Sequence, residues 1–555
     1  MLEKTRRWLA AHPNWALALV TLAVLAPFLA KPFNIDDPLF IWVAQQIYLH
    51  PGNPYGFDVN WAQTVFPMWH VTENPPLACY YLALSAGFFG WSEIGLHTAF
   101  LLPALAVVLG TRRLAGHFCR HPALAALATL FTPVFMVSGM TVMCDMLMLA
   151  FWVWAVIFWV EGMERDDFGF LALSGLLIAM AALTKYYGIS LVPLLLAHGG
   201  FRQRSPGRWM VYLLIPLAAL YVYQVAAIAL YGHNVLLRAV QFTAFVKSHF
   251  GYSRITAALN ALTFTGGCVA AAAFFTPLLW RRRVLAASGL GAILIAAALL
   301  FNSTIGNSSA VVNFQIVFWA AGGIGVVALA IADLIQRRDA GSWLLALWVL
   351  GTLSFAAFCN WTVNGRSILP MVPAMGILIV RRLEKQFPAG DKVWFRGTFI
   401  CLAASAALAL LVTRADVVLA RAVRESARET CAKLHSDGRT IWFQGHWGFQ
   451  FYMEQSGARA MDLANPALIP GDKFAVPVNN SNLRSPKLDL SAPGEFIAVS
   501  KSRFLTTMDE FAGAGFYASL TGPLPFAFGA VPPERVAIFN FNRFISEPAT
   551  SPPTH

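Results

Sequence analysis

The chain has 555 residues, of which 57% are hydrophobic and only 12% are charged, with a formal net charge of +12. A soluble protein of this length needs roughly a quarter charged residues to cover its surface, so the composition excludes an ordinary soluble protein. The apolar residues form blocks of membrane-spanning length, which predicts a multi-pass membrane protein. The basic residues form short clusters between these blocks rather than one face, which argues against nucleic acid as a partner.

The basic clusters predict a topology for the membrane part. They lie at 112–113, 202–208, 281–283, 337–338 and 381–385. Cytoplasmic loops of membrane proteins carry an excess of Lys and Arg, so we expect these clusters inside the cell. About thirteen crossings then follow, with the N-terminus in the cytoplasm and the C-terminal part outside.

The predicted spans follow one another with short connections. The first, near 14–32, leads into an external loop at 33–75, and residues 76–90 are predicted as a half-inserted or interfacial segment. The remaining spans lie near 94–111, 122–138, 143–161, 168–184, 187–200, 209–230, 258–280, 284–302, 314–335, 342–358, 367–380 and 397–413. The prediction for residues 1–413 is therefore an all-α polytopic membrane bundle.

The composition changes after about residue 414. Apolar runs shorten to strand length at 440–443, 474–478, 495–499 and 536–539, and an amphipathic stretch lies at 447–455. Gly, Pro and Asn are frequent between these runs. The pattern predicts a small α/β extracytoplasmic domain at 414–545, followed by a disordered tail at 546–555.

Among the ionisable residues that lie away from the basic clusters, five stand out in an apolar chain where such residues are costly. They are Asp36 and Asp37 after the first span, Glu73 in TENPPL, Asp145 in TVMCDMLMLAFW, and Lys185 in the turn LTKYYG. The predicted topology puts all five at the same external interface. Each also has a structural explanation. Asp36 and Asp37 suit the cap of a helix, and Glu73 precedes prolines that can start one. Asp145 lies near the end of its span, where a charge costs less, and Lys185 can reach lipid headgroups.

Acids and a base at one boundary between water and lipid suit glycosyl transfer from a lipid-linked donor. A carboxylate can take the proton of the acceptor hydroxyl as a general base. A cation beside the departing phosphate stabilises the charge that builds up there. Because the lipid tail keeps the donor in the bilayer, we expect such a site at membrane level.

Four segments resemble motifs of the GT-C glycosyltransferases, in family order across residues 36–380. The run DDPLFIWVA from Asp36 is similar to the acidic pair in the first external loop of that superfamily. TENPPLACYYLAL resembles the E-K-P-P-L-x-Y-W-L segment of its protein mannosyltransferase and lipid A aminoarabinose transferase branch (glycosyltransferase families 39 and 83). LTKYYG is similar to the L-T-K-G turn of that branch, and NGRSILPMVPAMGIL from Asn364 resembles its R-Y-x-L-P-x-x-P segment.

The resemblance implies a GT-C-like bundle and a role for each of these residues. Asp36 would be the catalytic base, with Asp37 as its neighbour in the catalytic pair. Asp145 stands in the place of a second family Asp at the start of a span. The residues implied to bind substrate are Glu73 and Asp145 for acceptor and donor, and Lys185 and Arg366 for the lipid phosphate.

Two departures from the branch concern the substrate. Asn74 stands where the branch usually has a Lys, which removes one phosphate-binding charge, and Asp37 is shorter than the usual second acid. The external loop 231–257 could supply the missing cation, or its basic residues could contact lipid headgroups. These residues are Arg238, Lys247, His249 and Arg254.

The predicted function is transfer of a sugar from a polyprenyl-phosphate donor to a lipid, polysaccharide or protein acceptor of the cell envelope. The reaction would be an inverting displacement at the periplasmic face of a bacterial inner membrane. The sequence indicates no certain cofactor, and a divalent cation stays an open possibility because some GT-C enzymes hold one with acids. The twelve His have no zinc spacing. The alternatives are a secondary transporter, with inverted repeats and polar residues near mid-membrane, or a non-catalytic membrane scaffold.

Overall fold

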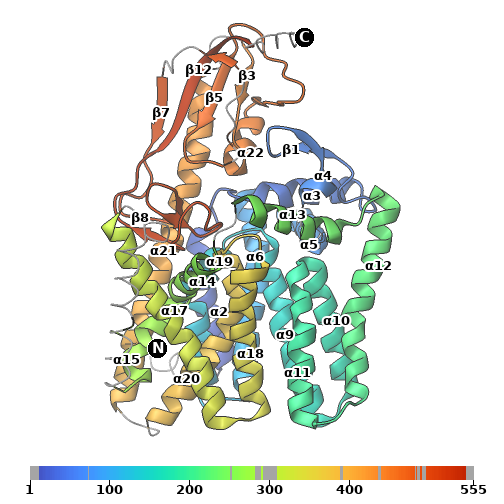
Figure 1. Cartoon of the computed structure of the whole chain (residues 1–555), viewed down its shortest axis with the longest axis vertical. Coiled ribbons are helices and arrows are strands. Elements are labelled where there is room, and N and C mark those ends of the chain that lie inside the picture. Colours follow the sequence, from blue (N-terminus) through green and yellow to red (C-terminus); the bar gives the residue numbers. More distant parts are fainter. Residues whose placement is uncertain are drawn as a thin grey trace, which may run out of the picture.

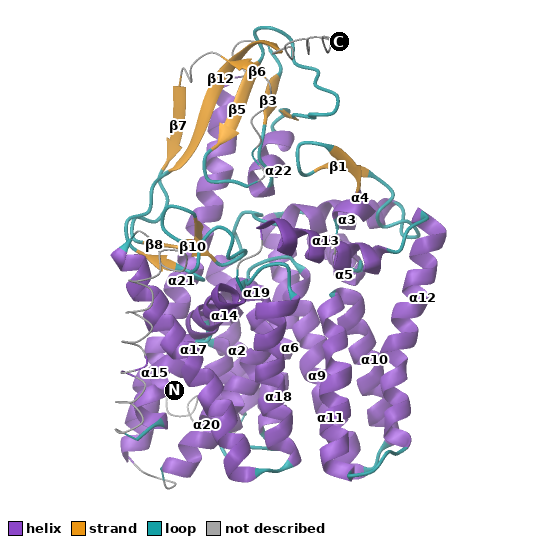
Figure 2. Cartoon of the chain, viewed as in Figure 1, coloured by secondary structure: helices purple, strands orange, loops and turns teal. Residues whose placement is uncertain are grey.

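A helical bundle carries a strand-containing domain at one end, which we call the upper end (Figures 1 and 2). The computed structural model describes residues 12–72, 74–250, 253–281, 289, 291, 309–387, 392–434, 439–481, 483, 488–490 and 495–544. The predicted tail at 546–555 and the predicted span at 284–302, except for two of its residues, lie outside the described part of the chain.

The first half of the bundle is built from helices joined by short connections. Their bounds are α2 (Pro13–Leu25), η1 (Ala26–Phe28), α3 (Asp37–Leu49), α4 (Met68–Val71), α5 (Leu77–Phe89), α6 (Glu93–Ala115), α7 (Pro122–Leu130), α8 (Pro133–Ser138), α9 (Cys144–Arg165), α10 (Phe168–Thr184), η2 (Tyr186–Ser190), α11 (Leu191–Gln203), η3 (Arg208–Leu213) and α12 (Leu214–Tyr231). A hairpin of β1 (Asp58–Asn60) and β2 (Val65–Pro67) lies between α3 and α4.

The second half continues in the same way. Its helices are α13 (Val235–Phe250), α14 (Arg254–Cys268), α15 (Ala270–Leu279), α17 (Ala310–Arg337), α18 (Ala340–Ser354), η4 (Phe355–Cys359), α19 (Gly365–Ile368), η5 (Leu369–Met371), α20 (Val372–Gln386) and α21 (Lys392–Leu434). Helices α3 and α13 lie across the upper end of the bundle (Figure 1).

Burial separates the inner helices from those that face outward. The apolar window of α9 is 83% buried inside the protein, whereas that of the span containing α12 is 28% buried. A helix that is apolar all round and deeply buried forms a core, and one that is apolar and exposed suits contact with lipid. Helix α9 is therefore central, and α12 stands at the edge of the bundle (Figure 1).

Among the described residues, six helices are long and apolar enough to cross a membrane. A seventh results if α14 and α15, which meet at 79°, count as one broken span. The predicted count of about thirteen is therefore not confirmed. One reason is that predicted spans are divided: residues 122–138 form α7 and α8, separated where Thr132 takes an extended conformation before Pro133.

The basic clusters at 112–113, 202–208, 337–338 and 381–385 lie at the lower end of the bundle, opposite the strand-containing domain (Figure 1). Arg113 at the end of α6 binds Glu161 near the end of α9, with 2.7 Å between Nη2 and Oε2. Arg381 in α20 lies 3.3 Å from Asp333 near the end of α17. These ends can be followed to the bottom of the bundle in Figure 1. The sequence analysis predicted that these clusters lie on one side of the membrane, and their grouping at one end of the bundle agrees with this.

The C-terminal part is built on a six-stranded sheet in the order β4–β3–β5–β12–β6, with β7 paired to β12. Its elements are β3 (Ile441–Phe443), α22 (Trp447–Gln455), β4 (Arg459–Ala460), β5 (Lys473–Pro477), β6 (Leu488–Leu490), β7 (Glu495–Val499) and β12 (Glu534–Phe544). Strand β3 runs parallel to β4 and β5, and β12 runs antiparallel to its neighbours.

Helix α21 runs without a break from the bundle to the sheet, so the predicted boundary between 413 and 414 lies inside it. The segment 505–529 contains the short strands β8 (Leu505–Thr506), β9 (Met508–Asp509), β10 (Ala514–Gly515) and β11 (Ala527–Phe528). We call it the saddle segment, because it lies on the upper end of the bundle (Figure 1). There Gln315 of α17 exchanges two hydrogen bonds with the backbone of Phe528, of 2.7 and 2.8 Å.

Candidate active site

Four charged side chains from distant parts of the chain meet at the upper ends of the helices. Arg366 joins two acids: its Nη2 donates to Oδ2 of Asp36 at 2.8 Å, and its Nη1 lies 3.9 Å from Oδ2 of Asp145. Lys185 Nζ donates to Oδ1 of Asp145 at 2.7 Å. We call these four residues the charged cluster. The structure therefore brings together four of the residues that the sequence singled out.

Helix ends position all four. Asp36 is the N-cap residue of α3, Asp145 lies in the first turn of α9, and Lys185 follows the last residue of α10 in an extended conformation. Arg366 lies in the short helix α19, whose N-cap Asn364 accepts a hydrogen bond from the backbone of Ser367 at 2.8 Å. Charged side chains at helix ends avoid the apolar middle of a span, where they are most costly.

The two acids of the DD pair have different surroundings. Asp37 is fully buried, and its two carboxylate oxygens accept backbone hydrogen bonds from Asn34 and Val142, each of 3.0 Å. Burial raises the pKa of Asp37 to about 6, although Lys31 and the two backbone donors lower it. Asp37 therefore holds the loop before α3 against the segment before α9, and its carboxylate does not face solvent.

Asp36 is the accessible carboxylate of the cluster. Its side chain is 27% exposed, whereas that of Asp145 is 0% exposed. Within the described residues, Nε of Arg366 and Oδ2 of Asp145 are buried without a hydrogen-bond partner. Buried polar groups normally find partners, so these two atoms mark a place for water or for a polar ligand.

His249 does not join the cluster. It lies exposed near the end of α13, where its Nδ1 is 2.9 Å from Ser248 Oγ and 3.0 Å from the carbonyl of Phe245. In the same helix, Lys247 donates to the carbonyl of Phe358. Glu73 lies outside the described residues, so its position relative to the cluster is not given.

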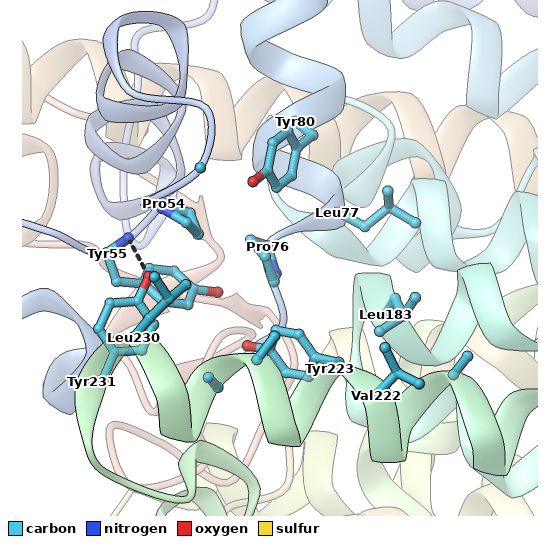
Figure 3. A pocket seen from close by; sticks show the side chains of 14 residues that line it. Pro54, Tyr55, Pro76, Leu77, Tyr80, Leu183, Val222, Tyr223, Leu230 and Tyr231 are labelled. Atoms are coloured by element: carbon cyan, nitrogen blue, oxygen red, sulfur yellow. Dashed lines mark hydrogen bonds between the residues drawn. The ribbon is translucent and has the colours of Figure 1, made fainter.

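An apolar cavity of about 560 Å³ lies between α12, the start of α5 and the loop after α3 (Figure 3). Leu183, two residues before Lys185, lines it from the end of α10. Tyr223 and Tyr231 line it from α12, and the hydroxyl of Tyr231 accepts from the backbone of Tyr55 at 3.2 Å. The cavity is bordered by α12, whose apolar window is only 28% buried inside the protein.

Two buried ionic residues next to the cluster were missed by the sequence analysis. Lys31 lies five residues before Asp36, and its Nζ is 2.6 Å from Oδ2 of Asp416 in α21. Their side chains are 1% and 3% exposed. A signal was present, because Asp416 and Arg414 are the two ionisable residues of the otherwise apolar run ALLVTRADVVLA.

The residues of the cluster do not fit a metal site. Over the described part of the chain, no group of three or more His, Cys, Asp or Glu could hold a metal ion. Asp36 and Asp145 are each paired with a cationic side chain, and both oxygens of Asp37 accept backbone hydrogen bonds. We therefore derive no step through a divalent cation.

Comparison with known family models gives a match for one region of the chain. Residues 73–221 match the family model described as dolichyl-phosphate-mannose-protein mannosyltransferase. This region contains Asp145 and Lys185 of the charged cluster. This match covers less than half of the chain, and it indicates a glycosyltransferase. A search of curated protein sequences finds no significant match.

The solved structures that match this chain are distant in sequence, and their TM-scores lie below 0.5. ArnT from Cupriavidus metallidurans bound to undecaprenyl phosphate is 15% identical, with a TM-score of 0.40 over 85% of this chain and 93% of that one. The apo form of the same protein is 16% identical, with a TM-score of 0.41 over 84% and 93% of the two chains. The oligosaccharyltransferase of Archaeoglobus fulgidus, tethered to an acceptor peptide, is 12% identical, with a TM-score of 0.47. That match covers 82% of this chain and 64% of the archaeal protein.

Proposed function

We propose that the protein transfers a sugar from a polyprenyl-phosphate donor to a hydroxyl of an envelope acceptor, with inversion at the anomeric carbon. The observation that carries the proposal is the convergence of Asp36, Asp145, Lys185 and Arg366 through contacts of 2.7 to 3.9 Å. The upper end of the bundle would then face the periplasm of a bacterial inner membrane, and the lower end, with its basic clusters, would face the cytoplasm.

Asp36 is the catalytic base in this proposal. It takes the proton of the acceptor hydroxyl while the oxygen forms a bond to the anomeric carbon. The bond from that carbon to the phosphate oxygen breaks, and its electron pair leaves with the polyprenyl phosphate. Asp36 is assigned this role because it is the accessible acid of the cluster, and the burial of Asp37 gives that residue a structural one.

Lys185 and Arg366 stabilise the leaving group. The donor phosphate is a diester with one negative charge, and it gains charge as it leaves as a monoester. A cation beside it therefore interacts more strongly with the transition state than with the bound donor, which is the condition for catalysis. In the structure Lys185 is paired with Asp145, and Arg366 with Asp36 and Asp145, so the donor phosphate must share both cations with these acids.

The apolar cavity suits the polyprenyl tail. Its lining is dominated by aliphatic and aromatic side chains, and Leu183 connects it to the turn that carries Lys185. A tail in the cavity would place its phosphate near this turn, at the level where the helices end. The cavity would thereby hold the lipid while the cluster acts on the sugar.

The two alternative functions fit less well. A secondary transporter is expected to place its charged site near mid-membrane, whereas the four cluster residues lie at helix ends. A non-catalytic scaffold gives no reason for Asp36 and Asp145 to share Arg366. The match to a mannosyltransferase family model favours neither alternative.

The proposal is tested by incubating the purified protein in lipid nanodiscs with a panel of synthetic polyprenyl-phosphate sugars and an extract of envelope lipids and glycans. We expect release of free polyprenyl phosphate and a glycosylated acceptor whose anomeric configuration is opposite to that of the donor, measured by mass spectrometry and NMR. Transfer from a nucleotide sugar with no polyprenyl donor, or retention of configuration, would contradict the proposal. Comparison of envelope glycans from cells with and without the gene would identify the acceptor.

The proposed binding of the polyprenyl tail in the apolar cavity gives a second expected result. Replacing Ala226, which lines the cavity, with Trp should raise KM for a long-chain donor about tenfold, because an indole ring fills part of the space. The matched control is Val225→Trp, since Val225 is 50% exposed and does not line the cavity. A short-chain donor should show little change with either variant. Equal KM values for long-chain donor in both variants would place the tail elsewhere.

A further inference from the structure

The buried pair of Lys31 and Asp416 has further partners. Oδ1 of Asp416 accepts a hydrogen bond from Thr507 Oγ1 at 2.7 Å, and the hydroxyl of Tyr517 lies 3.1 Å from each carboxylate oxygen. Thr507 and Tyr517 both belong to the saddle segment, and both are buried. Three parts of the chain therefore meet at one carboxylate: the loop before α3, the last long helix of the bundle, and the saddle segment.

The saddle segment also holds the segment that carries Arg366. The backbone N–H of Gly365 donates to the carbonyl of Phe516 at 2.7 Å, and the N–H of Ser519 donates to the carbonyl of Val363 at 2.8 Å. A Cβ atom at Gly365 would lie 2.7 Å from the ring of Phe516, so the two segments touch without spare room.

These contacts form a closed ring that includes two residues of the charged cluster, Asp36 and Arg366. Lys31 binds Asp416, Asp416 binds Tyr517, and the residue before Tyr517 holds the residue before Arg366. Arg366 then binds Asp36, which lies five residues after Lys31 and closes the ring at 2.8 Å. The position of the Asp36 carboxylate relative to the Arg366 guanidinium thus depends on contacts made outside the charged cluster.

We infer that Lys31, Asp416 and Tyr517 are positioning residues for the transfer reaction: they fix the Asp36 loop and the Arg366 segment against each other through the saddle segment. This inference rests on the proposed function for its effect on turnover. Burying an ion pair costs more than packing apolar side chains of similar size, so stability alone does not explain the pair. Catalytic groups must be held by residues that are themselves locked, and a misplacement of about 1 Å can cost 10²-fold in rate.

The direct test is Tyr517→Phe, which removes one hydroxyl and keeps the ring. The matched control is Tyr81→Phe, because the hydroxyl of Tyr81 donates to the carbonyl of Ala99 at 2.6 Å, and neither residue belongs to the ring of contacts described above. We expect a similar small decrease in Tm for both. In Tyr517→Phe, kcat should fall about tenfold with an unchanged KM for the donor, and Tyr81→Phe should keep the wild-type kcat.

Hydrogen exchange measured by mass spectrometry tests the inference without activity. Tyr517→Phe should raise exchange in the peptides 31–37 and 362–367 together, and Tyr81→Phe should raise it in neither. Increased exchange confined to the saddle segment would overturn the inference. A wild-type protein that releases no polyprenyl phosphate would contradict only the proposed function, since the exchange result stands by itself.

A double-mutant cycle adds a result that a purely structural role would not give. If Tyr517 acts through Arg366, the losses of kcat in Tyr517→Phe and Arg366→Lys should combine to less than their product. A further variant, Lys31→Met with Asp416→Leu, removes both charges at once and leaves neither buried alone. We expect it to fold with reduced kcat. Independent losses in the cycle, or wild-type kcat in this double variant, would overturn the inference.

Discussion

Replacing Asp36 with Asn is expected to lower turnover by about 10²- to 10⁴-fold, the range for removal of a general base. Asn has the same shape and its side-chain oxygen can still accept the hydrogen bond from Arg366, so the geometry of the cluster should persist. What the variant loses is the ability to take a proton. Rates of polyprenyl phosphate release from purified wild type and variant, at saturating donor, measure the effect.

The neighbouring acid is the control for this prediction. Asp37→Asn keeps one acceptor oxygen but places an NH₂ group against the backbone N–H of Asn34 or Val142, so we expect a decrease in Tm of several degrees. Asp36→Asn should leave Tm close to that of the wild type. Substantial turnover in Asp36→Asn with full loss in Asp37→Asn at unchanged Tm would reverse the two assignments.

The sequence identified most of the charged cluster because ionisable residues are sparse in an apolar chain. Asp145 and Lys185 stood out within apolar runs, and Arg366 was implied by the motif around it. Their pairing could not be predicted, since Arg366 lies 330 positions from Asp36 and meets it only through the packing of the bundle. The different burial of Asp36 and Asp37 was also out of reach, because the two residues are identical and adjacent in the sequence.

The sequence predicted the presence of a helical membrane part more reliably than the bounds of the individual spans. Hydropathy averaged over a window of roughly 20 residues cannot detect a break such as the one at Thr132, because the residues on both sides are apolar. The same averaging joined α14 and α15 into one predicted span, although they meet at 79°. Lys31 was overlooked for a related reason: it ends an apolar block, where a Lys is ordinarily explained by lipid headgroups.

Replacing Lys185 with Met is expected to lower turnover by about 10²- to 10³-fold, the range for loss of one group that stabilises transition-state charge. The substitution also leaves Asp145, which is 0% exposed, with only Arg366 at 3.9 Å. Removing one partner of a buried ion pair costs about 3–5 kcal/mol, so part of the loss could come from unfolding. Turnover must therefore be measured per folded molecule, with Tm recorded for each variant.

The double variant Lys185→Met with Asp145→Asn separates the two explanations. It removes the buried charge that the single substitution leaves without its partner, so stability should recover. If Lys185 acts on the departing phosphate, turnover should remain low in the double variant, because the cation is still missing. If turnover recovers together with stability, Lys185 only compensates the charge of Asp145, and its role at the phosphate is contradicted.

Arg381→Met provides the control for unfolding, since Arg381 is a buried cation paired with Asp333 at the opposite end of the bundle. A decrease in Tm without loss of turnover per folded molecule is expected there, because no substrate reaches that pair in the proposed reaction.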